Sequence, residues 1–193
     1  ICVSGMTRGV RAKKLLPREG AAAAMHWARP NSTEQEVLRV QVGTWSVCPT
    51  SKAFRPNRGT ADEHLSLAIR AAKALGSPVI RVVLGTWEDR LTDGGIERHM
   101  EQTSGVCRAL RSKAADAGVK IAIENHAGDM HSTELVRLIE TTGRDFVGAN
   151  LDSGNALWTL EDPIDSLERR SKYLLFGVGV APGGVQHRDA GRR

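Results

Sequence analysis

The chain has 193 residues, of which 40% are hydrophobic and 25% are charged, as in ordinary globular proteins, so one domain with a single core is expected. The formal net charge is +5, but residues 1–36 and residues 171–193 each carry +3, which leaves −1 for the stretch between them. A basic excess at the ends is typical of solvated tails, and nucleic acid is therefore not the expected partner.

Cysteine usage and hydropathy indicate the compartment. Cys2, Cys48 and Cys107 form no CxxC pair and no even set, which argues against a disulfide scaffold or a zinc ribbon and favours a reducing cytoplasm. The longest apolar stretches are far shorter than the roughly 20 residues that cross a bilayer, and the first six residues do not resemble a signal peptide. We therefore expect a cytoplasmic chain without a membrane partner.

From residue 38 onward, short apolar strands alternate with longer amphipathic helices, which is the pattern of consecutive βα units. Strands are predicted at residues 38–43, 79–84, 119–124 and 146–151, and helices at residues 60–76, 95–117, 132–143 and from 162. The strand spacing suits a barrel and an open doubly wound sheet equally well. A dinucleotide-binding fold is disfavoured because no GxGxxG motif follows any strand.

Several residues mark the ends of these helices. Thr60 and Glu63 form a capping box at the start of the first helix. Ser132 is the predicted N-cap of the third helix, and Pro163 suits the first position of the fourth.

The two ends of the chain lack a finished βα unit. We therefore divide it into a divergent N-terminal segment (1–36), a βα region (37–175) and a Gly/Arg-rich tail (176–193) that a frameshift could explain. Because the chain begins with Ile, we also expect that it is a fragment.

Two carboxylates lie at equivalent places, because Glu124 closes one apolar strand and Asp152 closes the next. The carboxyl ends of barrel strands hold the active site, and an acidic residue there is costly unless it is paired or bound to a cation. The spacing alone favours two explanations equally. One is a divalent metal held by both carboxylates, and the other is a structural role, in which they cap neighbouring helices or pair with Arg81 or Arg90.

The stretches IENHAGD (123–129) and LDSGN (151–155) are similar to those of a known family. Over residues 37–173 the chain resembles the xylose-isomerase-like TIM barrels, which include sugar phosphate isomerases and epimerases and relatives of apurinic (AP) endonucleases. The resemblance predicts an α/β fold of the (β/α) TIM-barrel type. The barrel is expected to be incomplete, with about strands three to six of eight recognisable.

The resemblance also implies a site. In the family one divalent metal ion (Mn, Mg, Co or Zn) is held by Glu, Asp, His and Glu from the ends of four consecutive strands. Glu124 and Asp152 match the first two ligands, and Glu124 would also be catalytic, as one of two glutamates that move a proton next to a carbonyl. The residues expected to contact substrate are His126, Asn155, Trp45, Trp87 and Trp158.

The third and fourth ligands, a His and a Glu, should follow Tyr173, but the expected strand gives way to a Gly-rich stretch after Leu175. His187 is the one candidate for the third ligand, and a frameshift or truncation is the favoured explanation. Two-base epimerisation then cannot be assembled, so whether this chain is an active enzyme stays open. Exposed sheet edges of an incomplete barrel would favour a homo-oligomer.

The leading hypothesis is a metal-dependent isomerase or epimerase of a small sugar or sugar phosphate. On this hypothesis Glu124→Gln abolishes turnover and leaves the fold intact. An alternative is a DNA-repair hydrolase of the AP-endonuclease type, which Asn155 in place of a His and the central charge of −1 disfavour. A non-catalytic barrel remnant is the third possibility, and metal titration would distinguish it.

Overall fold

The structure is a computed structural model that describes residues 2–3 and 42–178. Its strands are β1 (Cys2–Val3), β2 (Val42–Ser46), β3 (Val79–Val83), β4 (Lys120–Glu124), β5 (Val147–Asp152) and β6 (Leu174–Val178). They form one sheet in sequence order, in which β1 is antiparallel to β2 and all later neighbours are parallel. A doubly wound sheet reverses its strand order partway, so the observed order is that of successive barrel units.

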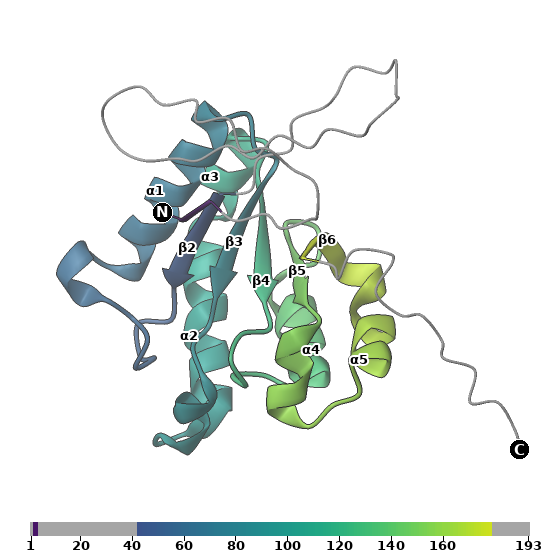
Figure 1. The fold of residues 1–193 in the computed structure, drawn as a ribbon. Coiled ribbons are helices and arrows are strands. Elements are labelled where there is room, and N and C mark those ends of the chain that lie inside the picture. Colours follow the sequence, from purple (N-terminus) through teal and green to yellow (C-terminus); the bar gives the residue numbers. More distant parts are fainter. Residues whose placement is uncertain (1, 4–41, 179–193) are drawn as a thin grey trace, which may run out of the picture.

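The helices follow the strands in alternation (Figure 1). They are α1 (Ala61–Ala74), α2 (Gly95–Ala109), α3 (Arg111–Asp116), α4 (Ser132–Thr142) and α5 (Pro163–Arg170). Short 3-10 turns are η1 (Pro56–Arg58), η2 (Trp87–Leu91), η3 (Gly154–Thr159) and η4 (Ser171–Tyr173). Among the described residues, no helix is long and apolar enough to cross a membrane.

The two faces of the sheet differ in chemistry. Alternate strand residues join the helices in one apolar core, among them Ile80, Val82, Ile121, Ile123, Val147 and Ala149. Because successive side chains of a strand point to opposite faces, the residues between them lie on the other side. We call this side the inner face, and it carries Arg81, Val83, Ala122, Glu124, Asn150 and Asp152.

The predicted helix starts are confirmed at α1 and α5. Thr60 and Glu63 form the capping box, with Thr60 N donating to Glu63 Oε2 at 2.7 Å and Glu63 N to Thr60 Oγ1 at 3.2 Å. Asp162 caps α5, and Pro163 is its first residue. At α4 the prediction is wrong by one residue. His131 is the N-cap, because its backbone is still extended (φ −68°, ψ 157°) and Ser132 is the first helical residue, whose side chain and N–H both donate to Glu161.

The predicted helix over residues 95–117 is wrong in one respect, because it breaks at Leu110 into α2 and α3. The N–H of Leu110 bonds the carbonyl of Cys107, three residues back, at 3.2 Å. This bond to the third residue back replaces the bond to the fourth residue back that continues an α-helix, so α2 ends here. Cys107 before the break and Ala114 after it are both fully buried. The spacing of buried residues therefore continues across the break, and the sequence shows no sign that the helix ends there.

Two strands also differ from their predicted bounds. β2 extends to Ser46, past the predicted end at Gly43, while residues 38–41 lie outside the described part.

The expectation that no strand continues after Leu175 is wrong, because β6 pairs with β5 through Phe176 opposite Asn150 and Gly177 opposite Leu151. A parallel ladder uses backbone groups, so the glycine does not prevent it. The sheet therefore has five parallel strands, one more than predicted.

Candidate functional site

The candidate site lies where the parallel strands end. Glu124 is the last residue of β4 and Asp152 the last residue of β5. The loops that follow β2, β3, β4 and β5 meet at this same edge, because all four strands run in one direction. We call these four loops the rim.

Glu124 is buried, with 3% of its surface exposed, and it has two polar partners on the inner face. Its Oε2 accepts a hydrogen bond from Arg81 Nη1 at 2.6 Å and one from Asn150 Nδ2 at 3.1 Å. The pairing with Arg81, one of the two alternatives that the sequence left open, is therefore present. Arg90 instead forms a two-point ion pair with Glu134, at 2.7 and 3.0 Å.

Asp152 shares the inner face with Glu124 but lies further out. Asn150 is opposite Glu124 in the register, and Asp152 is two residues further along β5. The Oδ1 of Asp152 accepts the N–H of Gly154 at 2.9 Å. The two carboxylates are therefore diagonal neighbours on adjacent strands.

These residues fit a divalent metal ion only in part. They supply two carboxylates on one face, the ligand type that hard cations prefer, but one oxygen of Glu124 is already paired with Arg81. Within residues 2–3 and 42–178, no group of three or more His, Cys, Asp or Glu side chains is placed to hold a metal. His187, the predicted third ligand, lies outside the described residues.

Asn125 joins the ends of β4 and β5. Its Nδ2 donates to Asp152 O at 2.8 Å, and its Oδ1 accepts from Asp152 N at 3.0 Å. Asn155, a predicted substrate contact, donates from Nδ2 to the carbonyl of Asn125 at 2.8 Å. The structure thus places Asn155 beside the two carboxylate-bearing strand ends, where it fastens one rim loop to the next.

Asp129 fastens the loop after β4 to the loop after β3. The side chain is fully buried, and its Oδ1 accepts from His126 N at 2.9 Å and Met130 N at 2.7 Å, while its Oδ2 accepts from Gly85 N at 3.2 Å. The imidazole of His126 makes a second contact between the same two loops, from Nδ1 to Gly85 O at 2.8 Å. Because a carbonyl can only accept, the proton of the neutral His126 ring is on Nδ1.

The pKa of Asp129 yields a prediction. Burial raises it to about 8, helped by the charge of Glu124 and opposed by the three backbone N–H groups. An unfolded Asp has a pKa of about 3.9, so between about pH 4 and pH 8 the folded chain keeps a proton that the unfolded chain releases. The free energy of unfolding is therefore expected to fall as the pH rises through this range, by a loss on the order of 5 kcal/mol.

Urea denaturation over that pH range tests the Asp129 prediction, with Asp129→Asn as the variant that cannot titrate. The variant should lose this part of the pH dependence. Equal slopes in the two proteins would show that another group is responsible.

Asp89 makes the third connection of the rim. It is fully buried, and its Oδ2 accepts from Ser51 Oγ at 2.7 Å and Thr86 N at 3.0 Å, while Oδ1 accepts from Lys52 N at 2.8 Å. The bonds from Ser51 and Lys52 join the loop after β2 to the loop after β3, and the bond from Thr86 lies within the loop after β3. Asp89, Asp129 and Asn125 therefore link all four rim loops in sequence order.

Two of the three tryptophans that were predicted to contact substrate lie close together at the rim. Trp87 and Trp158 are 47% and 62% exposed, and they flank Gly128 from the loops after β3 and β5. A Cβ added to Gly128 would lie 3.1 Å from Trp87 Cβ and 3.2 Å from Trp158 Cβ. Gly128 and the preceding Ala127 both have left-handed backbones, with φ of 74° and 42°. This tight bend lets both tryptophans approach. Trp45 lies on β2, but its side chain is outside the described part.

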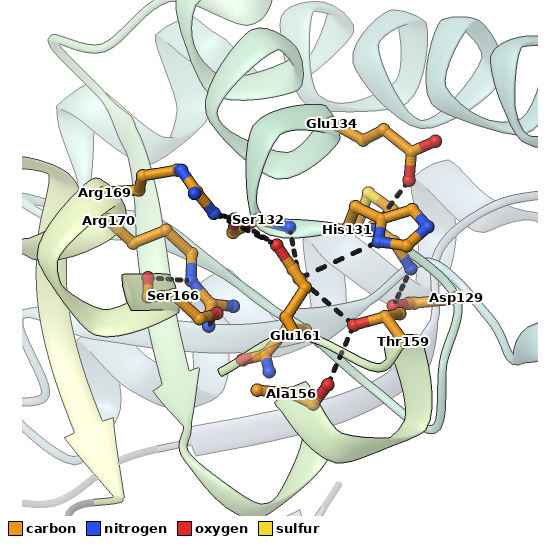
Figure 2. A network of polar contacts seen from close by, with 12 residues as sticks. Asp129, His131, Ser132, Glu134, Ala156, Thr159, Glu161, Ser166, Arg169 and Arg170 are labelled. Atoms are coloured by element: carbon orange, nitrogen blue, oxygen red, sulfur yellow. Dashed lines mark hydrogen bonds and ion pairs between the residues drawn. The ribbon is translucent and has the colours of Figure 1, made fainter. Parts of the chain in front are cut away.

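The start of α4 is held by a polar network (Figure 2). Glu161 accepts from Ser132 N at 2.8 Å, from Ser132 Oγ at 2.5 Å and from Thr159 Oγ1 at 3.1 Å. Arg169 Nη1 donates to Ser132 Oγ at 3.0 Å. Burial works against ionisation, yet the bonds from Ser132 hold the pKa of Glu161 below its usual value. A carboxylate is favoured at the positive end of a helix, so this network fixes where α4 leaves the rim.

Comparison with known proteins identifies the family. Parallel strands in sequence order, with helices on one face and polar residues at the carboxyl ends, define a protein of the (β/α)-barrel class. The family model of the xylose isomerase-like TIM barrel matches residues 40–184. The chain therefore belongs to this family.

Solved structures agree in fold. A xylose isomerase domain protein from Planctomyces limnophilus is 20% identical with a TM-score of 0.51, over 63% of this chain and 42% of that one. A 3-keto-D-glucoside 4-epimerase from E. coli is 13% identical with a TM-score of 0.55, over 70% and 57%. The IOLI protein, whose structure holds a zinc atom, is 19% identical with a TM-score of 0.50, over 67% and 48%.

The chain thus spans about half the length of these structures, and at such identities the likeness concerns the fold alone. No curated protein matches the chain in sequence.

Several residues of the site were not singled out from the sequence. Asn150 could have been found, because it lies two residues before Asp152 and so shares its face of the strand. Asn125 and Asp89 carried a weaker signal, since polar residues after a strand usually lie in solvated loops, and Asp129 was predicted only as a candidate cap of the helix near Ser132. Their burial follows from the way in which neighbouring loops meet, which one sequence does not show.

Proposed function

We propose that the chain carries part of the active site of a sugar or sugar-phosphate isomerase or epimerase, which moves a proton next to a carbonyl group. The observation that carries the proposal is the buried carboxylate of Glu124 at the carboxyl end of β4, held on the inner face by Arg81 and Asn150. Membership of the xylose isomerase-like family and the epimerase among the similar folds support it.

Glu124 is the proposed base. Both of its hydrogen bonds within the described part of the chain go to Oε2, which leaves Oε1 for the proton transfer. The carboxylate would take the proton from the carbon next to the carbonyl, and the C–H electron pair would pass into an enediolate. Return of the proton to the neighbouring carbon, with transfer of the hydroxyl proton to the former carbonyl oxygen, completes an isomerisation. Epimerisation needs a second base on the other side of the sugar.

A divalent metal ion (Mn, Mg, Co or Zn) belongs to this proposal, with Glu124 and Asp152 as two of its ligands and His187 as a candidate third. Such an ion, when bound, polarises the carbonyl and stabilises the enediolate. While no ion is bound, Arg81 and Asn150 fix the direction of the Glu124 carboxylate, because they hold one of its two oxygens.

The proposed sugar contacts lie around the rim. Trp87 and Trp158 are exposed and their Cβ atoms both lie beside Gly128, and we propose that their rings bind the apolar face of a sugar. For His126 and Asn155 we propose contacts with sugar hydroxyls, in addition to the bonds with which they fasten the loops. Trp45 stays a candidate from the sequence.

Exchange with heavy water tests the proposed function. A panel of aldoses, ketoses and their phosphates, incubated with the chain and Mn²⁺ in D₂O, should show deuterium at the carbon next to the carbonyl of at least one sugar. Mass spectrometry and NMR locate the label. The Glu101→Gln variant is the control, since Glu101 is an exposed carboxylate on α2 and its loss should leave the exchange unchanged. Absence of exchange with every sugar would contradict the proposal.

A further inference from the structure

The ion pair between Arg81 and Glu124 spans two neighbouring strands of the inner face. The nitrogen and oxygen atoms are 2.6 Å apart, and the two side chains are only 14% and 4% exposed. A carboxylate at this depth needs a compensating positive charge. Arg81 already supplies that charge, so Glu124 does not require a metal ion for it.

The pair is incomplete in its hydrogen bonding. Arg81 makes a single-point contact through Nη1, whereas Arg90 binds Glu134 through two nitrogens. The Nε of Arg81 is buried and has no hydrogen-bond partner in the part of the chain that the structure describes. A guanidinium has five N–H donors in a rigid fork, so Arg81 is held mainly by charge.

We propose that Arg81 is the resident counter-cation of Glu124 and that it competes with a divalent metal ion for this carboxylate. The inference rests on the proposed function in that it concerns the same site. A guanidinium and a metal ion cannot both contact Oε2, and two positive charges a few ångströms apart repel each other in a poorly solvated place. Metal binding at Glu124 and Asp152 is therefore weak while Arg81 stays in place, even through Oε1, and tight binding requires that Arg81 moves away. The Nε, which has no partner among the described residues, favours this movement, because the guanidinium would leave few bonds behind there.

Titration of the full chain with Mn²⁺ tests the competition. Isothermal calorimetry and the midpoint of thermal unfolding report binding without any sugar. Arg81→Met should bind Mn²⁺ on the order of tenfold or more tightly than the wild type, because the competing charge is gone. Arg81→Lys, which keeps the charge, should stay close to the wild type. Arg98→Met is the matched control, since Arg98 is half exposed and 3.7 Å from Asp93.

The double variant Arg81→Met/Glu124→Gln should lose the tight Mn²⁺ binding, which places the ion at Glu124. Equal or weaker binding by Arg81→Met, or no binding in the millimolar range, would overturn the inference. If Arg81→Met does not fold by itself, Mn²⁺ should restore its folded circular dichroism spectrum. Competition would also be refuted if Arg81→Met/Glu124→Gln folds while Arg81→Met stays unfolded even with Mn²⁺. A failed exchange experiment with sugars would leave this difference in affinity unaffected.

Discussion

Glu124→Gln is expected to abolish proton transfer and to destabilise the fold. The amide cannot take a proton from carbon, so the deuterium exchange proposed above should disappear. The change also leaves the buried guanidinium of Arg81 without its counter-charge, at 2.6 Å from a neutral group. Breaking a buried ion pair costs about 3 to 5 kcal/mol, and the 14% exposure of Arg81 reduces this to about 2 to 3 kcal/mol. The sequence alone suggested an intact fold, and the ion pair changes that expectation.

Urea denaturation and the exchange assay separate the two effects of Glu124→Gln. Adding Arg81→Met to the variant removes the unpaired charge and should recover most of the stability, but none of the exchange. Glu101→Gln, with the same chemical change at an exposed position, should match the wild type in both measurements. If the Glu124→Gln variant still exchanges deuterium, Glu124 is not the base.

Gly85→Ala is expected to destabilise the chain by about 3 kcal/mol or more. A Cβ at this position would lie 1.8 Å from Asp89 Oδ2 and 2.5 Å from Ser51 Oγ. Asp89 cannot move aside cheaply, because its two oxygens accept three hydrogen bonds, two of which join the first two rim loops. The methyl group would break these bonds and leave buried donors without partners.

Gly105→Ala is the matched control for Gly85→Ala. Gly105 lies in α2, and a Cβ there meets nothing within 4 Å. Alanine in a helix interior is preferred to glycine by about 0.5 to 1 kcal/mol, so this change should raise the free energy of unfolding. Similar losses for both variants in urea denaturation would mean that the close approach at Gly85 is not the cause.

The positions of Glu124 and Asp152 could be predicted because each ends a short apolar run. Hydrophobic periodicity marks strands, and a charge at the end of a strand marks its carboxyl edge. The same periodicity predicted α1 and α5, where Thr60 and Asp162 give the local start signals. The alternation of strands and helices predicted consecutive βα units, and the barrel type was predicted from the resemblance to the family.

Contacts between distant residues could not be predicted in the same way. Arg81 and Glu124 are 43 residues apart, and the sequence left open whether the carboxylate pairs with an arginine or binds a metal ion. The register of β3 against β4 decides that Arg81 reaches Glu124, and register depends on packing over the whole sheet. The break at Leu110 and the strand β6 were missed for a related reason, because backbone hydrogen bonds carry little sequence signal.

The three buried side chains that link the rim loops have a consequence for ligand entry. Asp89, Asp129 and Asn125 each join a loop to the next, so one loop cannot swing open alone without breaking buried hydrogen bonds. A molecule arriving at this edge would meet a preorganised surface and would lose little binding free energy in ordering it. Selectivity would then arise from the fixed shape of the loops rather than from a lid that closes over the bound molecule.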